Sequence, residues 1–179
     1  MTRKPTIAVI GAGKWGQALH FALSQKQETF ITSRTARDIK NFTDLNTALN
    51  CDYLIIAIPA QQLKSWLKEN FIFKNQKILV ASKGIEASSG EFLNEIYADY
   101  VPQNNIGFIS GPSFAAEVIQ GLPCALVLNS TSKKLYQEFK PFFPTFIKTY
   151  YSTDVIGAEV AGAYKNVLAI AGGICEGLN

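Results

Sequence analysis

Three glycines near the N-terminus have the spacing of a turn that binds phosphate groups. Gly11, Gly13 and Gly16 follow the β-branched apolar run of residues 7–10 and precede a helix-spaced apolar pattern. In such a strand–turn–helix context, the first glycine permits the tight turn, the second lets the backbone approach a pyrophosphate, and the third allows close helix–strand packing. The free N–H groups and positive dipole end of the helix would face the phosphates. The pattern predicts a dinucleotide site; the alternative is an ordinary glycine turn.

Lys165 has surroundings that are unusual for a lysine. On a helix, its neighbours three and four positions away are small or apolar, so it lies on no charged stripe. Burial there would favour the neutral amine and lower the lysine pKa, and a second cation such as Lys83 would act in the same direction. A lysine tuned toward neutrality can act as a general base. We therefore expect Lys165 to be catalytic, and Asn166 to hydrogen-bond the cofactor amide or the substrate.

Three further polar residues follow predicted strands, where ligands collect in an open parallel sheet. Arg34 stands where NAD-selective folds usually place a carboxylate, and an arginine there suits the 2′-phosphate of NADP, although it also fits a solvated loop. Lys83 lies between a buried strand and Gly84, and it either holds an anionic substrate or belongs to a surface turn. Ser113 can cap a short helix whose first N–H groups would also be offered to a ligand.

The elements that must position these residues alternate between strands and helices. Apolar runs predict strands at residues 7–10, 29–33, 53–58, 77–81, 106–110, 124–128 and 146–151. Helical patterns follow the glycine turn and recur at residues 61–69, 89–99, from 113 onward and 132–140. This alternation indicates an α/β fold with a Rossmann-type, doubly wound, mostly parallel sheet.

The composition changes after about residue 154, where a long helix rich in Ala and Gly begins. A poorly amphipathic helix needs packing partners on several sides. We expect residues 1–154 to form the dinucleotide-binding domain and residues 155–179 to be the first helix of a truncated helical domain. The helix could match a bilayer in length, but Glu159 and Lys165 would be costly in lipid, so no membrane insertion is expected. Its exposed surface invites self-association, which leaves a homodimer open.

The overall composition argues against several function classes. The net charge of +3, from 17 basic and 14 acidic residues without long runs of either sign, does not favour nucleic-acid binding. The three cysteines are widely spaced, so neither a metal site nor a disulfide framework is predicted. Reduced thiols and an N-terminus without a signal-type apolar region favour a cytoplasmic location. No serine, cysteine or histidine nucleophile constellation is visible.

Four motifs taken together resemble the bacterial NAD(P)-dependent glycerol-3-phosphate dehydrogenases. They are Gly11-Ala-Gly-Lys-Trp-Gly16, Ala81-Ser-Lys-Gly-Ile-Glu86, Ser110-Gly-Pro-Ser-Phe-Ala115 and Gly162-Ala-Tyr-Lys-Asn-Val-Leu-Ala-Ile-Ala-Gly-Gly173. The resemblance runs from the first strand to the last residue. It implies the interconversion of sn-glycerol 3-phosphate and dihydroxyacetone phosphate, mainly as a reduction that supplies glycerophospholipid synthesis.

The resemblance also implies site residues, with NADP or NAD as cofactor, and Arg34 favours NADPH. By position, the cofactor contacts are Gly11, Gly13, Lys14, Trp15, Gly16, Arg34, Lys83 and Ala115. The substrate contacts are Lys83, Gly111, Ser113 and Lys165, of which Lys165 matches the proton acceptor. The family's second domain supplies an aspartate and an arginine–asparagine pair, and none of these can be assigned in this sequence.

Two other functions stay open at this point. One is another NADP-dependent hydroxyacid or ketoacid reductase of the same two-domain plan, since some of these also place a lysine and an asparagine on the first helix after the sheet. The other is a non-catalytic module that binds a dinucleotide and senses redox state. A substrate panel separates the first from the triose-phosphate enzyme, and binding without turnover would favour the second.

Overall fold

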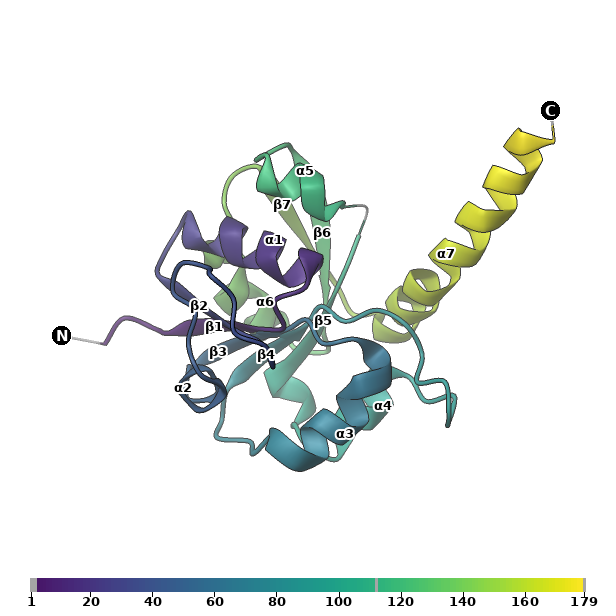
Figure 1. The fold of residues 1–179 in the computed structure, drawn as a ribbon. Helices are drawn as coiled ribbons and strands as arrows, with labels where there is room; N and C mark the ends of the chain where they lie inside the picture. The colour runs from purple at the N-terminus through teal and green to yellow at the C-terminus, as the bar shows by residue number, and fades with distance from the viewer. Residues whose placement is uncertain (1–2, 112, 179) are drawn as a thin grey trace.

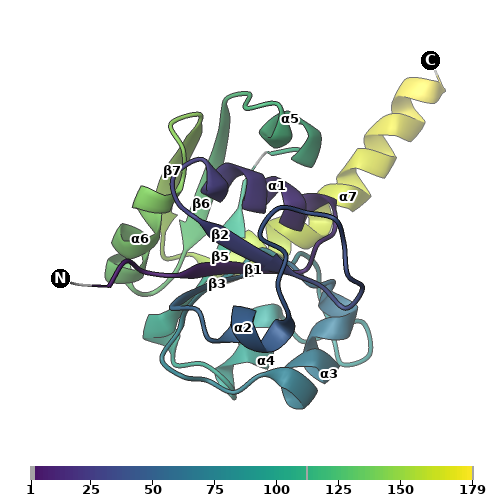
Figure 2. The same ribbon diagram turned by 60° about the vertical axis from the view of Figure 1, so that its left-hand side comes forward.

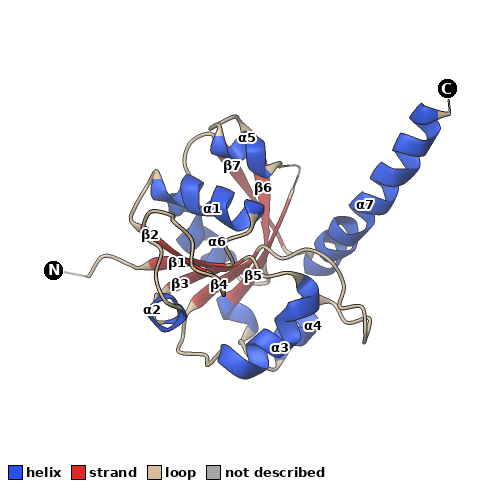
Figure 3. Cartoon of the chain, in the orientation of Figure 1, coloured by secondary structure: helices blue, strands red, loops and turns tan. Residues whose placement is uncertain are grey.

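A twisted sheet flanked by helices forms the centre of the computed structural model, which describes residues 3–111 and 113–178 (Figure 1). Among these residues, seven strands make one sheet in the spatial order β2-β1-β3-β4-β5-β6-β7. The strands are β1 (Ile7–Ile10), β2 (Thr29–Thr32), β3 (Tyr53–Ile56), β4 (Lys77–Val80), β5 (Ile106–Ser110), β6 (Cys124–Asn129) and β7 (Ile147–Ser152). Figure 3 shows these strands in red, enclosed by the blue helices.

Parallel pairing joins β2, β1, β3, β4 and β5, which confirms the Rossmann-type, mostly parallel sheet. The chain passes from β1 to β2 on one side and then to β3 on the other, so β1 and β3 flank the switch point where such sheets bind ligands. The exception is β6, which pairs antiparallel with β5 and parallel with β7.

Helices cover both faces of the sheet (Figure 2). Those on one face are α1 (Lys14–Ser24), α5 (Ala115–Ile119) and α6 (Lys133–Phe139); those on the other are α2 (Leu45–Leu49), α3 (Ala60–Asn70) and α4 (Leu93–Ala98). Ile7 and Val9 belong to the core on one face, and Ala8 and Ile10 belong to the core on the other. Because successive strand residues point to opposite faces, an uninterrupted apolar run here reports a strand covered on both sides.

Three local predictions need correction. The helix expected at residues 89–99 is limited to α4, because a loop with Gly90 at φ +74° precedes it. The helix expected from Ser113 begins at Ala115 with Phe114 at its N-cap, so Ser113 does not cap it. The short helix α2 was not predicted. Asp44 is its N-cap residue, and the Asp44 side chain accepts a hydrogen bond from the backbone N–H of Thr47.

Helix α7 (Val155–Gly177) leaves the body of the protein and is drawn in yellow in Figure 1. Its first turns pack against β5 and α4, and most of its later side chains are exposed, including Tyr164 and Leu168. Among the described residues, no other element covers the outer turns, so the packing partners that such a helix needs are not among them. In the described part of the chain, no helix combines the length and the apolar character needed to cross a bilayer.

Candidate active site

The glycine turn after β1 is shaped by two contacts that leave no room for a side chain. Gly11 has φ +109°, and a Cβ atom added there would lie 2.4 Å from the carbonyl oxygen of Ala57. A Cβ atom on Gly16 would lie 1.8 Å from the carbonyl oxygen of Gly11. Gly13, in contrast, has nothing within 4 Å of an added Cβ atom, so this part of the turn faces open space. The turn is therefore closely packed at Gly11 and Gly16 and open at Gly13, where a ligand would approach.

The open side of this turn borders a cleft of about 820 Å³ across the carboxyl ends of β1, β2 and β3. Helix α1 begins beside it with Gly13 at the N-cap, without a side-chain cap and without an acidic residue in its first turn. An uncapped helix N-terminus offers N–H donors to an anion. Arg34 and Arg37 also line the cleft, so its far end carries two cations. The size, donors and charge of the cleft fit a dinucleotide.

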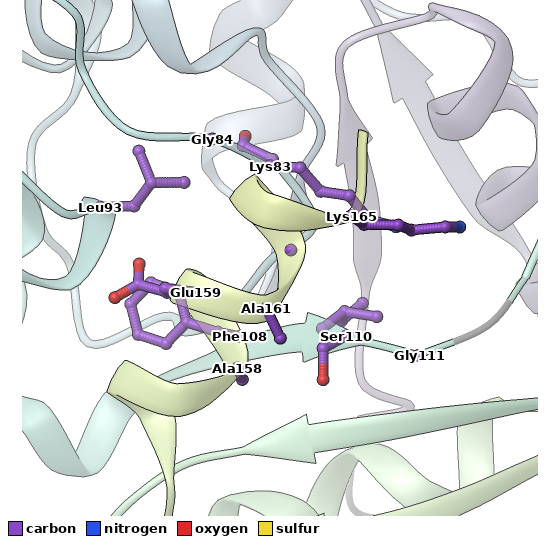
Figure 4. Close-up of a pocket in the computed structure, with 13 residues that line it drawn as sticks. Lys83, Gly84, Leu93, Phe108, Ser110, Gly111, Ala158, Glu159, Ala161 and Lys165 are labelled. Atoms are coloured by element: carbon purple, nitrogen blue, oxygen red, sulfur yellow. The ribbon is translucent and has the colours of Figure 1, made fainter. Parts of the chain in front are cut away.

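A second cavity, of about 350 Å³, lies at the carboxyl ends of β4 and β5 and is closed on one side by α7 (Figure 4). Lys83 reaches it from the loop after β4, Ser110 and Gly111 from the end of β5, and Glu159 and Lys165 from α7. In Figure 4 the long side chains of Lys83 and Lys165 extend in the same direction. Two elements far apart in sequence, the loop after β4 and α7, thus bring two cations to one cavity.

Lys83 connects this cavity to the start of α1. Its ammonium nitrogen lies 5.9 Å from the centre of the Trp15 ring. Although Lys83 as a residue is exposed, desolvation of its ammonium group lowers the pKa, and the positive charge of Lys165 lowers it further. Lys165 itself is exposed, and its ammonium nitrogen lies 4.9 Å from the centre of the Phe114 ring. The expectation that Lys165 is buried is wrong, because the outer part of α7 is uncovered in the described structure.

Two buried polar atoms, one in the first turn of α1 and one just before α5, are unpartnered within the described residues. They are Nε1 of Trp15 and Oγ of Ser113. A buried donor without a partner is costly, and such atoms are usually satisfied by a ligand or water.

Not every predicted site residue lines one of the two cavities. Lys14 is exposed on the first turn of α1, and Ala115 packs against the core at the start of α5. Ser113 is buried and lines neither cavity. Pro112 and the side chain of Asn166 lie outside the described residues, so the role expected for Asn166 stays a prediction.

Comparison with known proteins shows the family to which the chain belongs. The family model of the NAD-dependent glycerol-3-phosphate dehydrogenase N-terminus matches residues 33–136, and the model of the C-terminus matches residues 154–179. The chain belongs to the NAD-dependent glycerol-3-phosphate dehydrogenase family.

Curated relatives in the glycerol-3-phosphate dehydrogenase family agree over nearly the whole chain. The glycerol-3-phosphate dehydrogenase (NAD(P)+) of Sulfurimonas denitrificans is 66% identical over 96% of this chain, and that of Campylobacter jejuni is 57% identical over 96%. The chain spans 58% of the length of each of these relatives. The crystal structure of glycerol-3-phosphate dehydrogenase from Coxiella burnetii superimposes with a TM-score of 0.83 at 28% identity, covering 98% of this chain and 62% of that one.

The loop that carries Lys83 in this family member is held by a carboxylate. Glu86 accepts hydrogen bonds from Oγ of Ser88 at 2.7 Å and from the backbone N and Oγ of Ser89 at 2.8 and 2.7 Å. These donors, led by the Ser88 hydroxyl, lower the pKa of Glu86 to about 2. The loop after β4 is thereby tied to a fixed anion, and Lys83 projects from its base.

Sequence reasoning missed one buried residue of the cavity that Lys83 and Lys165 line. Glu159 was considered only as a charge that opposes membrane insertion, yet it lines the 350 Å³ cavity and is 9% exposed. Burial raises its pKa to about 7. The signal that could have found it is a carboxylate among the apolar and small residues at the start of this helix, six residues before Lys165.

Proposed function

We propose that the protein interconverts sn-glycerol 3-phosphate and dihydroxyacetone phosphate with NAD(P)(H), acting mainly as a reductase. The observation that carries this proposal is the convergence of Lys83 and Lys165 on one cavity beside the glycine-turn cleft. A phosphorylated three-carbon substrate is small and anionic, and the cavity offers both the cations and the proximity to the dinucleotide cleft that it needs. Membership of the dehydrogenase family supports the same choice.

The proposed chemistry divides between the two lysines. When bound, the nicotinamide supplies or accepts the hydride. Lys165 accepts the hydroxyl proton of glycerol 3-phosphate in the oxidative direction and returns it to the carbonyl oxygen in the reductive direction. Lys83 holds the negative charge of the substrate and contacts the cofactor side through Trp15. Gly111 and Ser113 would complete the substrate contacts at the end of β5.

We propose NADPH as the preferred cofactor. Arg34 and Arg37 line the end of the cleft beyond β2, where the 2′-phosphate of NADP would lie. The nearby carboxylate of Asp44 is engaged in accepting hydrogen bonds from the backbone N of Thr47 at 2.9 Å and from its Oγ1 at 2.6 Å. This end of the cleft therefore carries two arginine side chains and a carboxylate whose oxygens already accept hydrogen bonds. Gly11, Gly13, Lys14, Trp15, Gly16 and Ala115 are the further proposed cofactor contacts.

We also propose how the protein is organised and used. Residues 1–154 form the dinucleotide-binding domain, and residues 155–179 begin a helical substrate domain, in agreement with the match to the C-terminal family model. The product would supply glycerophospholipid synthesis in the cytoplasm. A homodimer stays a prediction, which sedimentation analysis of the protein at several concentrations would check.

The test of the proposed function is the Lys165→Ala variant, in protein that carries the C-terminal domain over the length seen in the relatives. We expect oxidation of NADPH with dihydroxyacetone phosphate to fall at least about a thousandfold, while the dissociation constant for NADPH changes less than twofold. Lys133→Ala, at an exposed lysine on α6, serves as the matched control. Undiminished turnover in Lys165→Ala would remove this lysine from its role.

A substrate panel tests the competing functions. Turnover of a ketoacid in the absence of turnover of dihydroxyacetone phosphate would favour a different reductase of the same plan. Tight NADPH binding without turnover of any substrate would favour a redox-sensing module.

A further inference from the structure

Glu159 makes a contact between two helices that the proposed chemistry does not use. Its Oε1 accepts a hydrogen bond from the backbone N of Asn94 at 3.0 Å, in the first turn of α4. The N-cap residue of α4 is Phe92, which has no side-chain oxygen to offer to these N–H groups. Figure 4 shows the Glu159 carboxylate on the side of α7 near Leu93, while Lys165 extends the other way.

This contact is the buried part of an otherwise weakly attached helix. Of the α7 residues whose burial is described, Glu159 is the one that is buried, at 9% exposure. The helix packs mainly against β5 and α4, and the described residues after Ala163 are exposed. The first turns of α7, held by β5 and by the contact of Glu159 with α4, therefore fix the direction in which the helix leaves the sheet.

Lys165 lies on the same helix, six residues further along, and lines the same cavity. Because a helix rises 1.5 Å per residue, the two residues are separated by about 9 Å along the axis. A tilt of about 10° at Glu159 would displace the backbone at Lys165 by roughly 1.5 Å. Displacements of about 1 Å in a reacting group can reduce a rate about a hundredfold.

The second oxygen of Glu159 shows that the contact does not require a full charge. Oε2 is buried and unpartnered within the described residues. Burial raises the pKa of Glu159 to about 7. Hydrogen bonds from the backbone N–H groups of Asn94 and Leu93 lower this pKa, and the negative charge of Glu95 raises it further. Near neutral pH the carboxyl group is thus partly protonated, and a glutamine amide, which keeps the accepting oxygen, reproduces its neutral form.

We propose that Glu159 is a positioning residue for Lys165: by seating the first turns of α7 on the N-terminus of α4, it sets where the lysine enters the cavity. The inference rests on the proposed function, in which Lys165 moves the substrate proton. It assigns no contact with the substrate to Glu159.

A double-mutant cycle tests this proposal in the protein with its C-terminal domain complete. We expect Glu159→Ala to lower kcat at least about tenfold, with the NADPH dissociation constant changed less than twofold. Glu159→Gln keeps the acceptor for Asn94 and should retain kcat within about threefold. In the Lys165→Ala background, Glu159→Ala should cause no further loss, because the residue acts through the missing lysine. Glu28→Ala, at an exposed glutamate outside both cavities, is the control and should behave as the wild type.

Two results would overturn the proposal. One is a kcat of Glu159→Ala equal to that of Glu28→Ala while Lys165→Ala is inactive. That result would reject the inference and leave the proposed function intact. The other is a further loss of kcat when Glu159→Ala is added to Lys165→Ala, as large as the loss that Glu159→Ala causes alone. That result would show that Glu159 does not act through Lys165. Wild-type turnover in Lys165→Ala would instead reject both the proposed function and this inference. If Glu159→Ala does not fold, Glu159→Asp replaces it: its shorter carboxylate should lose kcat relative to Glu159→Gln, and equal rates would reject the inference.

Discussion

The Lys83 ammonium nitrogen lies 5.9 Å from the centre of the Trp15 ring, so the loop after β4 meets the first turn of α1. This contact links the cavity proposed for the substrate with the cleft proposed for the dinucleotide. A cation above an aromatic face is attracted by the ring quadrupole. The relationship places a positive charge between the two proposed sites.

The pKa of Lys83 gives the first prediction. Its pKa lies below the ordinary value of 10.5, so its positive charge is lost at a lower pH than that of a solvated lysine. We expect kcat/KM for dihydroxyacetone phosphate to fall as pH rises through this lowered pKa, because the neutral amine no longer holds the phosphate. Lys83→Met should lower kcat/KM at least about tenfold at pH 7, and Lys83→Arg should shift the onset of the alkaline decline to higher pH.

Lys148→Met is the control for the Lys83 series. Lys148 also lies above an aromatic ring, 5.4 Å from the centre of Tyr150, but it lines neither cavity. The kcat/KM of Lys148→Met should match that of the wild type. An alkaline decline that persists unchanged in Lys83→Arg would assign the titration to another group.

The glycine turn predicts that two alanine substitutions have different effects. Gly16→Ala places a Cβ atom 1.8 Å from the Gly11 carbonyl oxygen, so it should lower the free energy of unfolding by roughly 2 kcal/mol or more. In Gly13→Ala the added Cβ atom meets nothing within 4 Å, so the free energy of unfolding should fall by less than about 1 kcal/mol. The same variant should weaken NADPH binding at least about tenfold. Urea unfolding and fluorescence titration measure the two effects. Equal loss of stability in both variants would contradict the assignment.

The cofactor preference is expected to depend on the two arginines beyond β2. Arg34→Ala and Arg37→Ala should each raise the KM for NADPH about tenfold, while the KM for NADH changes less than twofold, because only NADP carries the 2′-phosphate. Steady-state kinetics with both cofactors checks this. Arg3→Ala is the control, since Arg3 pairs with Asp52 at 3.1 Å and lines neither cavity. Equal effects on both cofactors would reject a 2′-phosphate contact.

The buried Glu159 predicts a pH dependence of stability. Its folded pKa of about 7 lies above the ordinary value of 4.5, so its favourable contribution is full below about pH 4.5 and is lost as pH rises through 7. Glu159→Gln stays neutral and escapes this loss. We expect it to be more stable than the wild type at pH 8, by at most roughly 3 kcal/mol, and the difference to vanish near pH 4.5. Urea unfolding of both proteins at several pH values measures this, and a constant difference would contradict it.

The sequence alone was sufficient where structure depends on near neighbours. The turn needs a glycine at Gly16 because a side chain there would meet the carbonyl oxygen of Gly11, a few positions earlier, and the glycine spacing shows this requirement in the sequence. The continuous apolar strands likewise report burial on both faces, since each side chain must leave water whichever way it points. The parallel sheet and the dinucleotide cleft follow from these local patterns.

Only the tertiary structure decided which groups are buried and which meet. Lys165 lies among small residues in the sequence, yet it is exposed because burial requires a partner element, and none of the described elements covers that part of α7. The lowered lysine pKa belongs to Lys83, through desolvation and the charge of a residue 82 positions away. Glu159 gains its partner, Asn94, from a helix 65 residues earlier. Contacts of this kind depend on how separate elements pack, and no local pattern encodes them.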